Sequence, residues 1–331
     1  MDSILNSTDN RLPWKTRPQL LSFEASTTMK SLFRRARTVA ALAVVGVTAT
    51  ACAGASEPES VAPVNVSASA EVSELVPEPI KQRGTLRVAI PDIGSPLAYR
   101  EGDELRGMDP ALGEALAQVM GLKYQPEMIP FNATLPGLQS GRYDVSFGQF
   151  YVTEDRVQVV DFVTDWRDFS SFIVPADAEV KPEALTDVCG LPIGAMDGSV
   201  ELKFLNDAQA ECSARGRKPI SVNAFPSISA GVLAMSSGRV AGVLVGRGAG
   251  ESAIEKGQPF TLVGEIGGGP CATAVARTEY SDEMLAAVKK AYEVLIADGA
   301  YAQILDANNT TYGAIDNPTI YTRGSDHPIY K

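Results

Sequence analysis

The chain has 331 residues, of which 45% are apolar and 21% charged, and its formal net charge at pH 7 is −11. This size and composition suffice for one or two globular cores. The acidic balance argues against nucleic acid or an anionic membrane surface as a partner. A single histidine, His327, essentially excludes histidine-based catalysis and multi-histidine metal sites, and we expect neither a metal nor a cofactor.

Residues 1–51 are predicted to be a leader and lipoprotein signal peptide. A basic cluster is followed directly by an uncharged run of small and apolar residues, 39–51. At about 13 residues this run is too short for a resident membrane helix, and it fits the apolar region of a signal peptide. Met29 is the natural start of such a signal, so residues 1–28 are either a mis-assigned extension or an unusual leader.

The run ends at Ala49-Thr50-Ala51-Cys52, which resembles the lipobox of bacterial lipoproteins. In that motif a peptidase cuts before the cysteine, whose thiol carries diacylglycerol. Position 49 is usually Leu there and is Ala here, and the alternative is an ordinary cleavage site with an incidental cysteine. We expect an extracytoplasmic protein anchored to the cell membrane by a lipid on Cys52.

Residues 52–79 consist mainly of Ala, Ser, Glu, Val and Pro. Such a composition buries too little apolar surface to offset its ordering entropy, so we predict a disordered tether after the lipidated cysteine. Residues 52–331 carry 22 basic and 37 acidic side chains, a net charge of about −15 that favours solubility.

Three further cysteines follow the tether. Cys189 and Cys212 lie 23 residues apart and flank one predicted strand–helix unit. In a compartment that permits disulfides we expect them to be bridged, with a stabilisation of roughly 2–4 kcal/mol. Cys271 is then left over, and a buried apolar role is favoured over a catalytic one.

Strands and helices are predicted to alternate along the remaining chain. Apolar runs introduced or ended by glycine indicate strands at 84–90, 123–129, 143–147, 189–195, 219–222, 240–245 and 272–277. Helical spacing of apolar residues indicates helices at 108–120, 134–140, 199–214, 228–236, 282–298 and 301–306. This alternation predicts an α/β fold with mainly parallel sheets.

Several motifs occur in order along this region. They are GTLRVAI from Gly84, LRGMDPALGEALAQVMG from Leu105, LPGLQSGRYDV from Leu135, VTEDRVQVVDF from Val152, IGAMDGS from Ile193, LAMSSGRVAGVLV from Leu233 and LIADGAYAQIL from Leu295. Together they resemble the family 3 extracellular solute-binding proteins, the polar amino-acid substrate-binding lipoproteins of ABC importers. The resemblance extends from Gly84 to about Ile320.

The resemblance implies a two-lobed, type II periplasmic-binding-protein fold, in which two parallel-rich sheets are joined by two hinge crossovers. Residues 80–172 plus 271–331 would form lobe 1, and residues 173–270 would form lobe 2. A small carboxylate or amino-acid-like ligand would bind in the cleft between the lobes. We expect a monomer that partners ABC permease subunits in the membrane.

Arg156 is the first candidate for the ligand site, since the resemblance places it where the family's arginine binds the ligand carboxylate. A guanidinium offers paired donors that fit a carboxylate and keeps its charge. The alternative is a surface arginine paired with Glu154 or Asp155. The preceding residues Gly148, Gln149 and Tyr151 would present carbonyls and side chains to the ligand, although Tyr151 could also serve packing alone.

The remaining candidates come from both lobes. Phe131 falls on an apolar or aromatic position that would stack on the ligand, with ordinary core packing as its alternative. In lobe 2, Ser199 and Val200 begin a helix whose amides favour an anion. Met196 would form an adaptable wall.

One departure from the family concerns the ligand's amine. The stretch that carries two acids in the family has Ala241 and Gly246 at those positions, and the second acid usually pairs with the α-ammonium. A buried ammonium without a counter-charge would be costly. We therefore hypothesise a carboxylate without a free α-amine, or a ligand whose amine meets Asp197, Glu201 or Asp92.

We expect a binding protein and no enzyme, because no set of nucleophile, base and orienting residue can be assembled from the sequence. Two alternatives stay open. The chain could be a ligand-sensing receptor for a signalling partner, or a cyclohexadienyl-dehydratase-like enzyme on the same fold. The mechanism we expect is hinge closure around the ligand.

Overall fold

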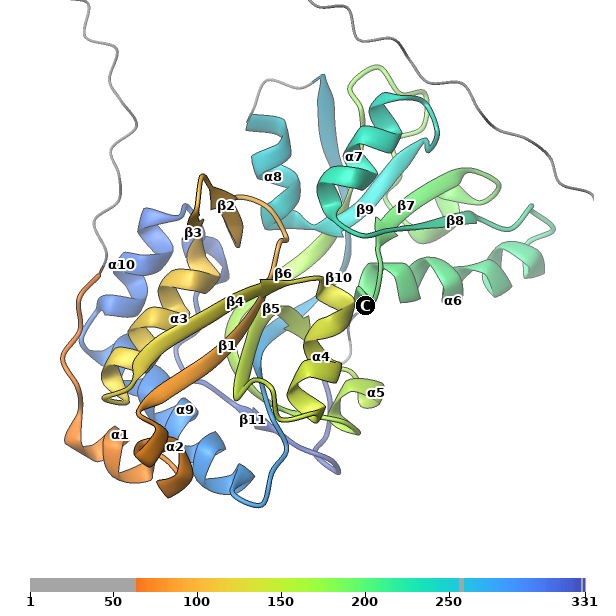
Figure 1. Cartoon of the computed structure of the whole chain (residues 1–331). Helices are drawn as coiled ribbons and strands as arrows, with labels where there is room; N and C mark the ends of the chain where they lie inside the picture. Colours follow the sequence, from red (N-terminus) through yellow and green to blue (C-terminus); the bar gives the residue numbers. More distant parts are fainter. Residues whose placement is uncertain (1–63, 256–258, 329, 331) are drawn as a thin grey trace, which may run out of the picture. The chain divides into compact units, whose positions relative to one another are not determined.

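Strands and helices alternate along the computed structural model, which describes residues 64–255, 259–328 and 330 (Figure 1). The strands are β1 (Thr85–Pro91), β2 (Tyr99–Glu101), β3 (Glu104–Arg106), β4 (Lys123–Ile129), β5 (Val145–Tyr151), β6 (Asp161–Pro175), β7 (Pro192–Met196), β8 (Ser221–Phe225), β9 (Gly242–Gly246), β10 (Phe260–Val275) and β11 (Ile320–Tyr321). The helices are α1 (Ala70–Leu75), α2 (Glu78–Arg83), α3 (Met108–Val119), α4 (Phe131–Gln139), α5 (Glu154–Val157), α6 (Val200–Ala214), α7 (Ile228–Ser236), α8 (Arg247–Glu255), α9 (Ser281–Ala297) and α10 (Ala300–Ala307), with 3-10 turns at Leu185–Val188 and Thr311–Gly313.

Two parallel sheets are joined by two long antiparallel strands, as the resemblance predicts. The hydrogen-bonded order is β4-β1-β5-β10-β6-β9-β7-β8. Strand β1 runs parallel to β4 and β5, and β7 runs parallel to β8 and β9. Strands β6 and β10 pair with each other along most of their length and link the two sheets. The fold is therefore the expected two-lobed periplasmic-binding-protein type.

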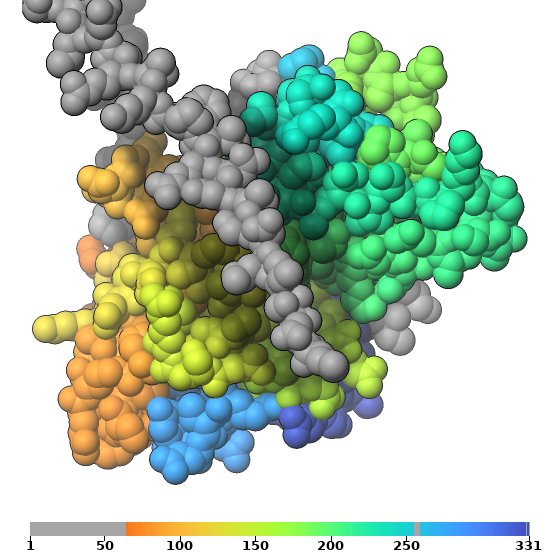
Figure 2. Space-filling model, turned by 45° about the vertical axis from the view of Figure 1, so that its right-hand side comes forward, coloured from red at the N-terminus to blue at the C-terminus, as the bar shows by residue number. Residues whose placement is uncertain are grey.

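Each lobe has its own apolar core. The first lobe packs α3 and α9 against its sheet through a cluster that includes Leu112, Leu116, Leu285 and Val288. The second lobe has one apolar cluster on the α6 side of its sheet and another that includes residues of α7. In Figure 2 orange, yellow-green and blue residues gather toward the lower left, and green to teal residues toward the upper right.

The connections between the lobes are continuous strands. The predicted lobe boundaries at residues 172/173 and 270/271 fall inside β6 and β10. The pairing of β6 with β10 is irregular on either side of Gly267, which has a φ of 50°. A strand irregularity of this kind bends the strand locally, and its position fits the predicted hinge.

The predicted tether is wrong for its second half. Helix α1 lies inside it, capped by the Ser69 side chain, which accepts a hydrogen bond from the Val72 amide. Val72 and Val76 are buried against the first lobe. Because these apolar side chains recur at helical spacing, they bury surface that the overall composition does not reveal.

The leader, its signal peptide and the lipidated Cys52 lie outside the described residues. Among the helices that the structure describes, none combines the length and apolar character needed to cross a bilayer. All the elements named above belong to one compact unit.

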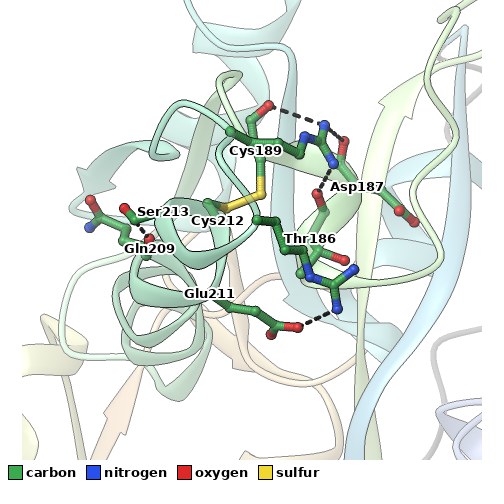
Figure 3. Close-up of a disulfide and its surroundings, with 9 residues drawn as sticks. Thr186, Asp187, Cys189, Gln209, Glu211, Cys212 and Ser213 are labelled. Atoms are coloured by element: carbon green, nitrogen blue, oxygen red, sulfur yellow. Dashed lines mark hydrogen bonds and ion pairs between the residues drawn. A yellow bond between two sulfur atoms is a disulfide. The ribbon is translucent and has the colours of Figure 1, made fainter.

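A disulfide joins Cys189 to Cys212 and confirms the predicted pairing (Figure 3). Their Cα atoms are 5.7 Å apart, and the bond ties the segment before β7 to the last turn of α6. The Arg217 guanidinium donates a hydrogen bond to the Thr186 carbonyl at 2.6 Å and fastens the same segment. Cys271 is a free, buried cysteine, as expected.

Candidate ligand-binding site

A small, partly open pocket lies between the two lobes. All eight residues predicted for the ligand site line this pocket: Phe131, Gly148, Gln149, Tyr151, Arg156, Met196, Ser199 and Val200. The lining also includes Ile93, Leu97, Asp168, Glu201, Ile228, Leu244, Val245, Gly246 and Ala249. The structure thus brings together segments that are up to 156 positions apart in the chain, from Ile93 to Ala249.

Arg156 projects from the short helix α5 toward the second lobe. Its guanidinium donates hydrogen bonds to the Tyr151 carbonyl at 3.0 Å and to the Gly198 carbonyl at 3.1 Å. It also lies over the rings of Phe131 and Phe150, at 5.8 and 5.4 Å from their centroids. Among the described residues it forms no ion pair, so the alternative of a surface pair with Glu154 or Asp155 is not observed.

The charge of Arg156 is therefore balanced only by carbonyl dipoles, aromatic faces and more distant acids. Burial lowers the pKa of the Arg156 guanidinium, and the Glu201 carboxylate counteracts this effect. A guanidinium carries five N–H donors, and the two carbonyl contacts use only part of this capacity. The group can accordingly accept an anion from the pocket.

An apolar wall faces Arg156. Phe131 begins helix α4, and its ring packs against Phe150 with 5.2 Å between centroids. Met196, at the end of β7, is buried on the opposite side of the pocket. Because these contacts fix Phe131 within the first lobe while one side of the ring lines the pocket, packing and ligand contact are compatible roles.

Strand β5 extends to Tyr151, four residues beyond the predicted end of this strand at residue 147. Its register against β10 shifts between Ser146 and Phe150. Gly148 has a φ of 140°, and a Cβ there would lie 2.8 Å from the Pro91 ring. Gln149 has a φ of 54°, a conformation that a residue with a side chain rarely adopts. This distortion turns Gln149 into the pocket lining, and strain of this kind is concentrated at functional sites.

The N-terminus of α6 lies across the pocket from Arg156. The Ser199 side chain caps this helix by accepting a hydrogen bond from the Leu202 amide at 3.2 Å. Its hydroxyl can still donate a hydrogen bond into the pocket. At the pocket mouth, the Asn132 side chain donates a hydrogen bond to the Asp197 carboxylate at 2.6 Å. This bond and the Arg156–Gly198 contact hold the lobes together in a closed arrangement.

Of the three acids proposed to meet a ligand amine, only Glu201 lines the pocket. Asp92 is exposed, and Asp197 bonds to Asn132 at the mouth. A second acid that the sequence does not predict for the site, Asp168 on β6, is 4% exposed and also lines the pocket. Burial raises the pKa of the Asp168 carboxyl to about 7. No sequence motif around Asp168 points to a role in the site, because only the pairing of β6 with its neighbours brings this residue to the pocket.

The pocket lining therefore combines a guanidinium, two carboxylates and apolar side chains. Such groups bind a small polar molecule by charge-assisted hydrogen bonds. It lies at the junction of two lobes linked by two strands, so both lobes can contact the same ligand.

Comparison with known proteins supports this architecture. Residues 86–309 match the bacterial extracellular solute-binding proteins, family 3. The arginine-binding protein ArgT of Corynebacterium glutamicum is 27% identical over 177 residues, which cover 51% of this chain and only 56% of that protein. The probable amino-acid-binding protein YxeM of Bacillus subtilis is 25% identical over 211 residues, 63% of this chain and 78% of that protein.

A solved structure, an ancestral arginine-binding protein bound to arginine, superposes with a TM-score of 0.63 and 26% identity. The superposition covers 68% of this chain and 98% of that protein. The family match spans most of the described residues and both lobes. The chain belongs to family 3 of the bacterial extracellular solute-binding proteins.

Proposed function

We propose that this protein is the substrate-binding lipoprotein of an ABC importer and that it captures an amino acid or a related small carboxylate by hinge closure. Arg156 binds the ligand carboxylate. The amides and hydroxyl at the start of α6 add donors from the second lobe, and Phe131 and Met196 form the apolar walls. The lipid on Cys52 holds the protein near the permease subunits that receive the ligand.

The main support for this proposal is the environment of the Arg156 guanidinium. Its guanidinium lines the pocket, contacts both lobes and forms no ion pair among the described residues. A charged group removed from water favours an anionic partner. A carboxylate supplies that charge and matches the guanidinium with two parallel hydrogen bonds.

The names of the relatives support the choice of ligand class. ArgT is an arginine-binding protein, YxeM a probable amino-acid-binding protein, and the ancestral protein holds arginine. These names suggest which compounds to test first. A thermal-shift screen over L-amino acids, keto acids and betaines would identify the compounds that stabilise the folded protein.

The decisive variant is Arg156→Ala. We expect it to weaken binding of the best compound by about 2 kcal/mol or more, roughly thirtyfold, because a buried charge-assisted contact is lost. Titration calorimetry measures this change. Arg142→Ala is the matched control, since Arg142 is exposed, forms an ion pair with Glu127 and is not among the residues that line the pocket in the described part of the chain. Equal affinity of the Arg156 variant and the wild type would exclude Arg156 from the site.

A further inference from the structure

Three buried polar groups of the pocket lining have no hydrogen-bond partner among the described residues. They are the Asp168 Oδ2 atom, the Gln149 Nε2 atom and the Tyr151 hydroxyl. An unsatisfied buried polar group costs free energy. Three such groups around one pocket indicate that a polar ligand satisfies them.

The space next to Asp168 is kept open by a glycine. A Cβ atom at Gly246 would lie 3.0 Å from the Asp168 Oδ2 atom and 3.7 Å from the Gln149 Oε1 atom. Any larger residue at position 246 would therefore press on the free carboxylate oxygen. Gly246 and Asp168 both line the pocket, so this glycine leaves room beside the carboxylate.

A second carboxylate lies near the first. Asp168 and Ser170 are two positions apart on β6, so their side chains share one face of the strand. The Ser170 hydroxyl donates a hydrogen bond to the Glu201 Oε1 atom at 2.8 Å, which fixes the orientation of Glu201. Asp168 and Glu201 are close enough for the Glu201 charge to contribute to the raised pKa of Asp168.

The charged side chains that line the pocket are one guanidinium and two carboxylates. A ligand that carries only a carboxylate would satisfy Arg156 and leave the acidic side unpaired. A ligand that also carries a cationic nitrogen would satisfy both sides, and its N–H groups would find an acceptor in the Asp168 Oδ2 atom.

On the basis of the proposed function, we propose that Asp168, with Glu201 beside it, binds the α-ammonium group of a ligand whose carboxylate lies on Arg156. The ligand class is then amino acids rather than simple carboxylates. The acid that binds the nitrogen comes from a strand that joins the lobes and not from the end of β9, where Gly246 stands.

Asp168 also has a structural contact, which the test must separate from ligand binding. Its Oδ1 atom accepts a hydrogen bond from the Tyr312 hydroxyl at 3.2 Å, and the backbone N–H of Gly248 in the first turn of α8 lies near the carboxylate. If Asp168 has only a structural role, its substitution should weaken the binding of every ligand equally. If Asp168 recognises a cation, its substitution should change the preference of the protein between ligands.

The experiment compares two ligand pairs by titration calorimetry. The probes are L-arginine with its des-amino analogue 5-guanidinopentanoate, and L-glutamine with 4-carbamoylbutanoate. We expect the wild type to bind at least one amino acid at least about tenfold more tightly than its des-amino analogue. Asp168→Asn, which keeps the shape of the side chain, should remove most of this preference. Asp177→Asn, an exposed acid just beyond the end of β6, is the matched control and should keep it.

The outcomes separate this inference from the proposed function. Equal binding of an amino acid and its des-amino analogue by the wild type would overturn the inference and leave carboxylate capture by Arg156 intact. If the Asp168→Asn variant kept the preference for the amino acid over its des-amino analogue, Asp168 would serve only to support α8. This result would also overturn the inference. Failure of every L-amino acid, keto acid and betaine of the thermal-shift screen to bind would contradict the proposed function itself. If the variant does not fold, the wild-type comparison still decides.

Discussion

At the scale of single residues, burial has opposite consequences for the two main charges of the pocket. It lowers the pKa of the Arg156 guanidinium, but the ordinary pKa of arginine is so high that the side chain stays charged. It raises the pKa of the Asp168 carboxyl to about 7, so this group is only partly ionised near neutral pH. The acidic side of the pocket can therefore respond to pH, and the cationic side cannot.

Ligand affinity is predicted to rise with pH from about 6 to 7 and to level off above. A cationic nitrogen favours ionised Asp168, so the pKa of Asp168 is lower in the complex than its value of about 7 without ligand. Below that value Asp168 must lose a proton before it can pair, which weakens binding by up to about tenfold per pH unit. Calorimetry with L-arginine at pH 6, 7 and 8 measures the slope.

The other titratable groups around Asp168 do not reverse this sign. Burial raises the pKa of the Tyr151 and Tyr312 hydroxyls and of the Cys271 thiol, so these groups are neutral throughout the range. The Glu201 charge acts in the same direction as burial on Asp168. The Asp168→Asn variant should have a flat profile, and an affinity that falls from pH 6 to 8 in the wild type would contradict the assignment.

The sequence alone identifies some of the pocket residues but not others. Arg156, Phe131 and Ser199 stand within or beside motifs that the family resemblance locates, so their positions in space follow from their positions in the motif. Asp168 has no such neighbour, because its role depends on the register of β6 against β9 and on the missing side chain at Gly246. A local pattern carries no information on strand register, which is a property of the assembled sheet.

At the scale of elements, helices α1 and α2 extend the first lobe toward the N-terminus. Val72, Val76 and Ile80 are spaced by four and are buried in the first-lobe core. This spacing places Val72 and Val76 on one helical face, and it was the signal that could have identified the segment. The Ala- and Ser-rich composition concealed this spacing. An average over the whole segment does not reveal a single row of apolar residues.

The Val72→Ala variant tests whether this segment belongs to the folded lobe. Val72 is fully buried, so removing two methyl groups should lower the free energy of unfolding by roughly 1–3 kcal/mol. Chemical denaturation followed by circular dichroism measures the loss. Glu74→Ala, at an exposed position of the same helix, should change stability little. Identical unfolding midpoints for Val72→Ala and wild type would restore the tether as the correct description.

At the scale of the whole described unit, the lobes are coupled through a continuous sheet. Strands β6 and β10 run from one lobe into the other, with an irregular register at Gly267. Tyr330 lies against this bend. Its hydroxyl accepts a hydrogen bond from the Val152 amide at 2.7 Å and donates one to the Pro270 carbonyl at 2.8 Å. Opening of the cleft between the lobes would therefore bend β6 and β10. It would also break the Asn132–Asp197 and Arg156–Gly198 contacts.

A ligand that touches Arg156 in one lobe and the start of α6 in the other adds free energy only to the closed arrangement. Such differential binding is what shifts a population toward closure. The Asn132–Asp197 and Arg156–Gly198 contacts also join the lobes and add to the stability of the closed arrangement.

The most direct test is a crystal structure of the protein with L-arginine. The account predicts the ligand carboxylate within hydrogen-bonding distance of the Arg156 guanidinium, and a cationic nitrogen of the ligand on the Asp168 carboxylate. A ligand bound outside the cleft, or a carboxylate held without any contact to Arg156, would contradict it.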